Sequence, residues 1–424
     1  MGWQTNYLNF KNRAALDSLK ANQLRAEAFA NFENSGLPTK KDEAWKFTSL
    51  TGFKNVEWTL PSGEETFLTH EQMQEVSKQL PSEFLNFVFV NGILNKTLSD
   101  DPEGFFEIVE VTEADFKTDS ENVEGRLLNL AHAFLNKKTE MKLAKGKTIE
   151  QPVQIVYIQS SAAAVYGSEK VNVQLEENSE MQLLLTTMSF NNGRPDAMNL
   201  NVDVKVGPQA RLKLIQLQNE DTQSFHFSQV NLVLESSAHV STLALSIGNK
   251  LTRNFYHLSF VGQNAEAQVY GVSVLDGDQH ADNYTFIQHQ IGHNQSVQHY
   301  KSIVSGEAHS VFRGRVQIAQ DAQKANSEQL NNNLLLTRTA QADSIPQLEI
   351  FADDVKAGHG STVGQLNKDE IFYFLSRGIN QFQAVQMLSY GFASELIYKF
   401  ETPALQAFLL SALNKKLEKL VQNG

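Results

Sequence analysis

The residues with the clearest chemical potential lie in the segment Gln347–Gln365, which reads QLEIFADDVKAGHGSTVGQ. Leu348 and Ile350 alternate with polar neighbours, which predicts a β-strand. His359 follows between two glycines, in the small-residue stretch Ala357–Ser361, and glycine permits positive φ and close backbone approach. We therefore expect a tight bend at His359, as an ordinary turn residue or as a ligand or relay group, since imidazole both binds metals and carries protons.

A cluster of histidines between residues 280 and 309 is a second candidate. His289, His293 and His299 differ by even steps, so an unbroken strand would place them on one face. Strand residues four apart are separated by about 13 Å, which is too far to share one ion. We therefore expect polar sheet or interface packing here rather than a metal site. The cluster comprises five of the 11 histidines: His280, His289, His293, His299 and His309.

A partial nucleotide-binding motif occurs at Lys145–Thr148, which contains the Gly-Lys-Thr end of a phosphate-binding loop. The complete motif needs a glycine five residues before Gly146, and Met141 occupies that position. We therefore expect no ATP hydrolysis by this chain, and any ATP use in its pathway belongs to a partner.

Three aspartates, Asp276, Asp278 and Asp282, are candidates for the paired carboxylates of a glycoside-cleaving enzyme. Such enzymes act on extracellular polymers and usually carry a signal peptide. The N-terminal stretch MGWQTNYLNFKNRAALDSL has no apolar signal core. A carbohydrate-active enzyme therefore remains one alternative, and a purely structural solenoid adaptor is another.

Composition restricts the classes of function. The 424 residues are enough for two or three domains. The 36 basic and 48 acidic side chains give a formal net charge of −12, which argues against a nucleic-acid partner. There is no cysteine, so disulfides, thiolate nucleophiles and cysteine-bound clusters are excluded for this chain on its own. No apolar run approaches the roughly 20 residues of a membrane span. We expect a soluble cytoplasmic protein without a membrane partner.

A repeat pattern occupies residues 141–366, where alternating strands run into polar or glycine corners and then into second strands. Small residues mark equivalent corners at intervals of 31, 28 and 27 positions: Ser179, Ala210, Ala238 and Ala265. A fixed period of this length is typical of a solenoid, in which each coil buries its apolar face only by stacking on its neighbours. We predict a mainly β fold with a β-helix core, and a β-sandwich is the main alternative.

Helical patterns flank the repeats. In an N-terminal helical and mixed domain, residues 1–140, apolar spacing predicts helices over about 14–34 and 125–136, and Asn91-Gly92 predicts a hairpin. In a C-terminal helical domain, residues 367–424, three helices are expected to start at Asn367, Asn380 and Thr402-Pro403. We expect the apolar faces of these three helices to pack on one another.

Two motifs resemble hallmarks of the SufB/SufD family, the scaffold subunits of the Suf iron–sulfur cluster assembly system. One is P-x-L-E-I-x-A-D-D-V-K-x-x-H-G-x-T-V-G, Pro346 to Gly364, followed by FYFLSRGI at residues 372–379. The other is LPTKKDEAWKFTSL, residues 37–50, in which we expect Trp45 to be a packing anchor. Both match without gaps. The absence of cysteine makes the chain similar to the SufD branch in particular.

The resemblance implies a right-handed parallel β-helix flanked by helical regions, and a non-catalytic scaffold subunit. It implies a SufB-like partner joined through the β-helix edges, with a homodimer through the same edge when SufB is absent. It further implies that the C-terminal helical region docks a SufC-like ABC-type ATPase. The residues that would form this docking surface are Phe372, Tyr373, Ser376, Arg377, Gly378 and Ile379.

The resemblance also implies that His359 lies at the SufB–SufD interface as a ligand for iron or a nascent cluster. Many family members carry a cysteine two residues earlier, where this chain has Ala357. Thiolate ligands would then come from the partner. This chain alone would hold no tightly bound cofactor, and iron or an iron–sulfur cluster would be transient at the interface. Asp353, Asp354 and Lys356 are close enough in sequence to orient His359.

Overall fold

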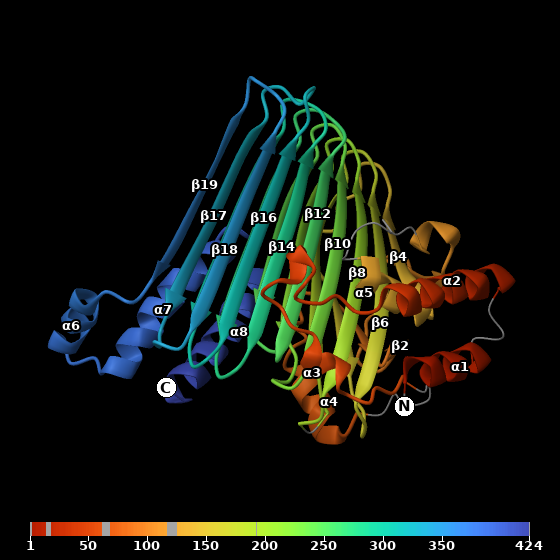
Figure 1. Ribbon diagram of the computed structural model, residues 1–424, viewed down its shortest axis with the longest axis horizontal. Coiled ribbons are helices and arrows are strands. Elements are labelled where there is room, and N and C mark those ends of the chain that lie inside the picture. The colour runs from red at the N-terminus through yellow and green to blue at the C-terminus, as the bar shows by residue number, and fades with distance from the viewer. Residues whose placement is uncertain (1, 14–17, 62–67, 117–124, 192, 424) are drawn as a thin grey trace.

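The computed structural model describes the chain except for residues 1, 14–17, 62–67, 117–124, 192 and 424. Two β-sheets face each other, and successive strands alternate between them (Figure 1). Within the described residues, sheet B has 10 strands in the order β19-β17-β15-β13-β11-β9-β7-β5-β1-β2, and sheet A has 9 in the order β18-β16-β14-β12-β10-β8-β6-β4-β3. Pairing is parallel from β4 onward. The predicted β-helix is therefore confirmed, and the β-sandwich alternative is not.

The strands of sheet B are β1 (Leu85–Val90), β2 (Ile93–Leu94), β5 (Val153–Gln159), β7 (Glu180–Ser189), β9 (Arg211–Asn219), β11 (His239–Ser246), β13 (Glu266–Leu275), β15 (Gln295–Val304), β17 (Asn326–Leu335) and β19 (Lys356–Gly364). The strands of sheet A are β3 (Glu107–Glu110), β4 (Lys137–Leu143), β6 (Val165–Leu175), β8 (Asp196–Val206), β10 (Phe225–Leu234), β12 (Leu251–Phe260), β14 (His280–His289), β16 (His309–Ile318) and β18 (Gln341–Ile350). The hairpin β1–β2 and the pair β3–β4 are antiparallel and close the N-terminal end of the stack.

The corners from sheet A to sheet B explain the sequence period. In the four corners that follow β6, β8, β10 and β12, a residue with φ near +60° precedes a small, buried residue. The left-handed residue turns the chain, and the small side chain fits the narrow inside of the corner. The pairs are Asn178-Ser179, Gln209-Ala210, Ser237-Ala238 and Asn264-Ala265. The predicted sequence period therefore corresponds to one coil of the β-helix.

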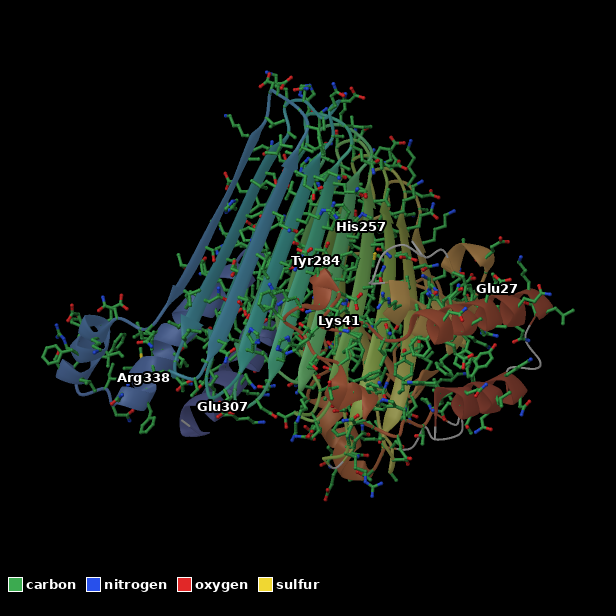
Figure 2. All side chains as sticks on the ribbon, in the orientation of Figure 1. Glu27, Lys41, His257, Tyr284, Glu307 and Arg338 are labelled. Carbon is green, nitrogen blue, oxygen red and sulfur yellow. The ribbon has the colours of Figure 1, made fainter. Side chains whose placement is uncertain are left out.

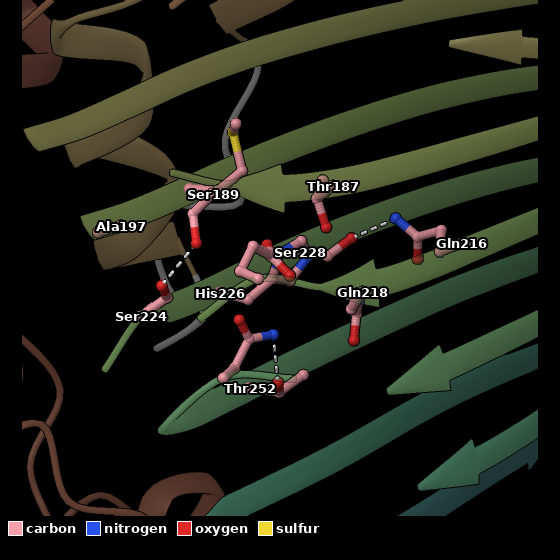
Figure 3. Close-up of polar contacts among 12 residues, drawn as sticks. Thr187, Ser189, Ala197, Gln216, Gln218, Ser224, His226, Ser228 and Thr252 are labelled. Atoms are coloured by element: carbon pink, nitrogen blue, oxygen red, sulfur yellow. Dashed lines mark hydrogen bonds and ion pairs between the residues drawn. The ribbon is translucent and has the colours of Figure 1, made fainter. Parts of the chain in front are cut away.

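The space between the sheets is apolar along one side and polar along the other. Val202, Val230 and Tyr256 occupy one inward-facing column of sheet A, in register from β8 to β12. On the polar side, Gln216 Nε2 donates to Ser228 Oγ at 2.8 Å, and Ser189 and Ser224 are joined by their hydroxyls (Figure 3). Buried polar groups persist in a core when they find such partners.

Most N-terminal helices cover the outer face of sheet A over β6 to β12, whereas α4 packs on β1 and β5 of sheet B (Figure 1). Phe53, fully buried, packs on Phe225 and Phe227 of β10. The predicted hairpin is confirmed, with Asn91 and Gly92 both at positive φ. The elements are α1 (Trp3–Arg13), α2 (Leu19–Ser35), η2 (Glu43–Trp45), α3 (Thr51–Lys54), α4 (His70–Ser77), η3 (Glu113–Phe116) and α5 (Gly125–Ala133). Of these, α2 and α5 confirm the two predicted helices, although residues 14–17 of the first prediction lie outside the described residues.

The C-terminal helices are α6 (Lys368–Ser376), α7 (Gln381–Ile397) and α8 (Pro403–Asn423), so the three predicted starts are confirmed. We expected their apolar faces to pack on one another, but α7 and α8 also pack on sheet B. The apolar faces of α7 and α8 bury Leu396, Leu409 and Leu413 against the outer face of sheet B, which itself is apolar there. None of the helices in the described part of the chain combines the length and the apolar character needed to cross a lipid bilayer.

Candidate functional site

His359 lies in the middle of β19, the last strand of sheet B, and not at a tight bend. The bend expected at Ala357–Ser361 is therefore wrong, because neither Gly358 nor Gly360 has positive φ and the chain there pairs with β17. Glycines that flank a residue in an edge strand give the same sequence pattern as a turn. The chain instead turns between β18 and β19, around Asp353-Asp354.

The register gives the direction of the His359 side chain. His359 lies opposite Gln329 of β17, which lies opposite Gln298 of β15, and all three belong to the column that faces the solenoid interior. Gln298 and Gln329 are almost fully buried, whereas His359 is exposed because no coil follows it. His359 is therefore the last member of an interior polar column and lies at the open C-terminal end of the β-helix.

The C-terminal end of the stack has two unpaired strand edges, those of β18 and β19. Large apolar side chains are exposed around them: Phe351 is 62% exposed, Val363 53% and Ile350 41%. Unpaired edges with exposed apolar residues are poised to pair with another chain.

The charged neighbours in sequence do not orient His359 within this chain. Asp354 forms an ion pair with Lys324, in the corner before β17. Lys356 begins β19 and pairs with Asn326. Because it is three residues before His359, its side chain points to the other face of the strand. Among the described residues, no hydrogen bond or ion pair engages the His359 ring.

The even spacing of the three central histidines does not place them on one face, because the strand is broken between them. His289 ends β14 with its Nε2 2.9 Å from Ser296 Oγ in the interior. His293 occupies a corner at φ 64°, and His299 faces outward on β15 with its Nε2 2.7 Å from Asn332 Oδ1. In the part of the chain that the structure describes, no three His, Asp or Glu side chains are arranged to hold a metal ion. The expectation of polar packing is confirmed.

The other two histidines meet edge to face on the outer face of sheet A. His280 of β14 lies opposite His309 of β16, with ring centroids 4.9 Å apart. His280 Nε2 is 2.9 Å from Thr48 Oγ1, and His309 Nε2 is 2.7 Å from Asp343 Oδ2. Burial lowers the pKa of His280 to about 4. It is therefore a neutral packing group at pH 7.

The segment Leu37–Leu50 packs the N-terminal region onto this face through Thr48, and its Lys41 lies in front of sheet A in Figure 2. Trp45 is fully buried, and the guanidinium of Arg253 lies 4.6 Å from its ring centroid. Arg253 in turn forms a buried ion pair with Asp282, which accepts a hydrogen bond from Thr48. Trp45 is confirmed as a packing anchor.

The two partial catalytic motifs have structural roles. Lys145–Thr148 forms a corner between β4 and β5, and Lys145 pairs with Glu177 at 2.6 Å, so no strand-to-helix phosphate loop exists there. Asp282 is paired with Arg253 in the core, and Asp278 with Lys250 at 3.2 Å on the surface. These aspartates do not form the free carboxylate pair that a glycosidase needs.

The predicted docking residues lie on and just after α6, which has no buried residue. Phe372 is 71% exposed and Tyr373 57%, and the guanidinium of Arg377 lies 5.3 Å from the Tyr373 ring centroid. Gly378 ends the helix at φ 81°. In Figure 1, α6 extends away from the sheets at the end of the molecule that carries β19. Phe372, Tyr373 and Leu375 are therefore largely open to solvent, although Tyr373 also contacts Phe374 and Arg377.

A groove between α7 and α8 continues this surface. It has a volume of about 820 Å³ and begins at Ile379. Met387 and Tyr390 of α7 and Leu410 of α8 line it, together with amide side chains. The sequence analysis missed these residues. No local signal separated them, because Met387 precedes the buried Ser394 by seven residues and so shares its helix face.

Comparisons with known proteins agree with the motifs. Residues 157–392 match the family described as "SUF system FeS cluster assembly, SufBD core domain". The iron–sulfur cluster assembly protein SufD of Escherichia coli is 30% identical over 391 residues, 90% of each chain. An iron–sulfur cluster assembly SufBD family protein of Synechocystis is 25% identical over 88% of this chain and 86% of its own, and one of Mycobacterium bovis is 26% identical over 96% of both.

Proposed function

Because the chain belongs to the SufB/SufD family and is SufD-like, we propose that it is a non-catalytic scaffold subunit of a SufBCD-type complex for iron–sulfur cluster assembly. The observation that carries the proposal is the open C-terminal end of the β-helix, where unpaired strand edges and His359 occur together. The cluster is cargo, assembled there and passed on. The subunit contributes position and ligands, and the chemistry of ATP belongs to a partner.

The edges of β18 and β19 are the surface for a SufB-like subunit. Edge-to-edge pairing would continue each sheet into the partner, satisfying backbone groups of both chains. It would also cover Ile350 and Val363, which are exposed here. When SufB is absent, the same edges can pair two copies of this chain as a homodimer.

His359 is a ligand for iron or for the nascent cluster in this arrangement. Its ring is exposed, lies at the open end and has no internal partner among the described residues, so it is available to a metal. One imidazole is too few ligands to hold a cluster. With Ala357 two residues earlier and no cysteine in the chain, the thiolates come from the SufB-like subunit. The site is complete only in the complex.

The surface of α6 and the α7–α8 groove docks a SufC-like ATPase. Phe372, Tyr373 and Ile379 offer apolar contacts, and Arg377 and the amide groups of the groove offer polar ones. The buried Lys301 of β15 pairs with Glu395 of α7 and donates to Phe392 O at 3.0 Å. Through these contacts, a movement of α7 driven by the ATPase would be transmitted to β15 and to the coils near the SufB–SufD interface.

The proposal is tested by co-expressing the tagged chain with SufB-like and SufC-like proteins from the same source and measuring the native mass. We expect a stable complex that contains all three. The variant Val363→Lys should release the SufB-like subunit, and Phe372→Ser should release the ATPase. Val233→Ser, which changes an exposed apolar residue on the outer face of sheet A, should release neither. If the wild-type chain stays alone or only pairs with itself, the scaffold function fails and must compete again with the carbohydrate-active enzyme and the structural adaptor.

A further inference from the structure

The N-terminal end of the β-helix contains a cavity of about 530 Å³. It lies between the first coils and the N-terminal region, at the opposite end of the stack from His359. Phe89, Thr139 and Glu169 line it from inward-facing strand positions, so the cavity opens into the solenoid interior. A volume of this size suits a small organic molecule.

Glu169 is an unusual residue for this position. It precedes Val171, Val173 and Leu175 of the apolar core by even steps, so its carboxyl points inward. A side chain at Gly92, in the β1–β2 turn, would come within 2.9 Å of its Oε1. No described residue hydrogen-bonds to it, and burial alone raises the pKa of Glu169 to about 8. At pH 7 it is therefore largely a neutral acid that can donate one hydrogen bond.

A second polar group lies deeper. The Tyr157 ring packs beside Phe89, with centroids 5.3 Å apart, and its hydroxyl is fully buried without a hydrogen-bond partner among the described residues. Burial raises the pKa of Tyr157, and the nearby Glu169 raises it further. An inward carboxyl that lines the cavity without a hydrogen-bond partner among the described residues, at one end of an apolar core, points to a polar atom supplied from outside the chain.

The other residues that line the cavity indicate the chemical class of its ligand. Phe10, Phe134 and Tyr166 supply aromatic walls, and Ile93 and Leu94 supply aliphatic ones. Lys96 and Lys137 also line the cavity and are exposed, so they lie at its mouth. In the described chain neither lysine has an ion-pair partner. The mouth therefore attracts anions, while the interior accepts an apolar body.

We propose that this cavity is a binding site for a small amphiphilic anion. Its apolar or aromatic body contacts the aromatic and aliphatic lining, its hydrogen-bonding group meets Glu169, and its anionic group meets Lys96 and Lys137. The site is independent of the cluster end and of the ATPase surface, and it does not depend on the proposed function.

The experiment is a titration of the full-length protein with the dye anilinonaphthalenesulfonate, an aromatic amine with a sulfonate. All three tryptophans, Trp3, Trp45 and Trp58, lie in the N-terminal region, and Trp3 packs on Tyr166 of the cavity wall at 5.2 Å. Because energy transfer falls steeply with distance, dye in this cavity should quench tryptophan emission, and dye on α6 at the far end should not. We expect one saturable dye per chain with strong transfer.

Variants give the second arm. Lys96→Ala/Lys137→Ala should weaken dye binding at least tenfold, and Glu169→Leu at least fivefold, while Glu169→Gln, which keeps a hydrogen-bonding group, stays within threefold of wild type. Lys415→Ala/Lys419→Ala makes the same charge change on the exposed face of α8 and should not alter binding, nor should Phe372→Ser. Thermal unfolding midpoints verify that each variant is folded. Saturable binding without energy transfer, or unchanged affinity in folded Lys96→Ala/Lys137→Ala or Glu169→Leu, would overturn the proposal.

Discussion

His359 of β19 lies directly opposite Gln329 of β17, in the register of the last pair of strands of sheet B. The pairing makes the histidine the terminal member of an interior column, and the lack of a further coil leaves it exposed. One strand edge thus combines two properties of an assembly surface: backbone groups that seek a partner and a ring that can bind a metal.

A substitution on β19 tests whether this strand edge pairs with the SufB-like subunit. Val363→Lys adds a charge to an exposed position of β19 without touching the buried coils, and charged residues on strand edges oppose edge pairing. We expect at least a tenfold loss of affinity for the SufB-like subunit, and loss of any homodimer, by analytical ultracentrifugation. The thermal unfolding midpoint should be unchanged. Retained homodimer and heterocomplex in this variant would place the interface elsewhere.

The proposed ATPase-docking surface gives a separate prediction. Met387→Asp introduces a charge into the α7–α8 groove at a position that is 51% exposed in the free chain. We expect at least a tenfold weaker capture of the SufC-like ATPase in a pull-down, because a buried unpaired charge opposes docking. Val233→Asp introduces the same charge at an exposed apolar position on the outer face of sheet A, and this control should bind normally. Equal capture by both variants would exclude the groove.

The buried pair Arg253–Asp282 stabilises the contact between the N-terminal region and sheet A. Asp282→Asn removes the charge that compensates Arg253 beneath Trp45, and we expect a loss of about 3–5 kcal/mol in the free energy of unfolding. Asp278→Asn removes the partner of Lys250 on the surface and should cost less than about 1 kcal/mol. Urea unfolding of the two variants measures both. Similar small losses would mean that the pair is not what joins these regions.

Acid sensitivity follows from His289. Burial lowers its pKa from 6.5 to about 4, so the folded state resists protonation. Its contribution to stability is complete above pH 6.5 and is lost as the pH falls toward 4, by about 2 kcal/mol between pH 7 and pH 5. His289→Gln should therefore flatten the pH dependence of the free energy of unfolding by that amount.

The matched control is His293→Asn, four residues later in an exposed corner at positive φ, a conformation that asparagine tolerates. This variant should keep the wild-type pH dependence. An unchanged slope in His289→Gln would show that the ring is not held neutral in the core.

The coil architecture was predictable because equivalent positions in successive coils of a solenoid need similar residues, which gives the sequence a period. Ser179, Ala210 and Ala238 recur at the coil period since each fills the same narrow corner. The helix starts at Asn380 and Pro403 were predictable for a similar reason, because capping depends on residues adjacent in sequence. Helix α1 was missed, since its polar sequence has weak periodicity and its buried side, with Tyr7 and Phe10, is defined only by packing.

Contacts between distant segments could not be predicted from local pattern. The glycines around His359 suggested a bend, and only the pairing with β17 shows that they lie in a strand. The inward position of Glu169 depends on the register of β6 with β8, and its cavity depends on how the N-terminal region meets the first coils. The sequence period could have predicted the position of His359. Gln298, Gln329 and His359 are 31 and 30 residues apart, so they occupy equivalent positions in successive coils.

The central claim is that the open end of this β-helix provides a ligand for a cluster built with a partner. The most direct test is cluster reconstitution on the complex with SufB-like and SufC-like subunits, comparing wild type with His359→Ala at equal assembly by native mass. The account predicts an intact complex and at least a tenfold lower yield of cluster, measured by its visible absorption and by iron content. Wild-type yield in a fully assembled His359→Ala complex would contradict it.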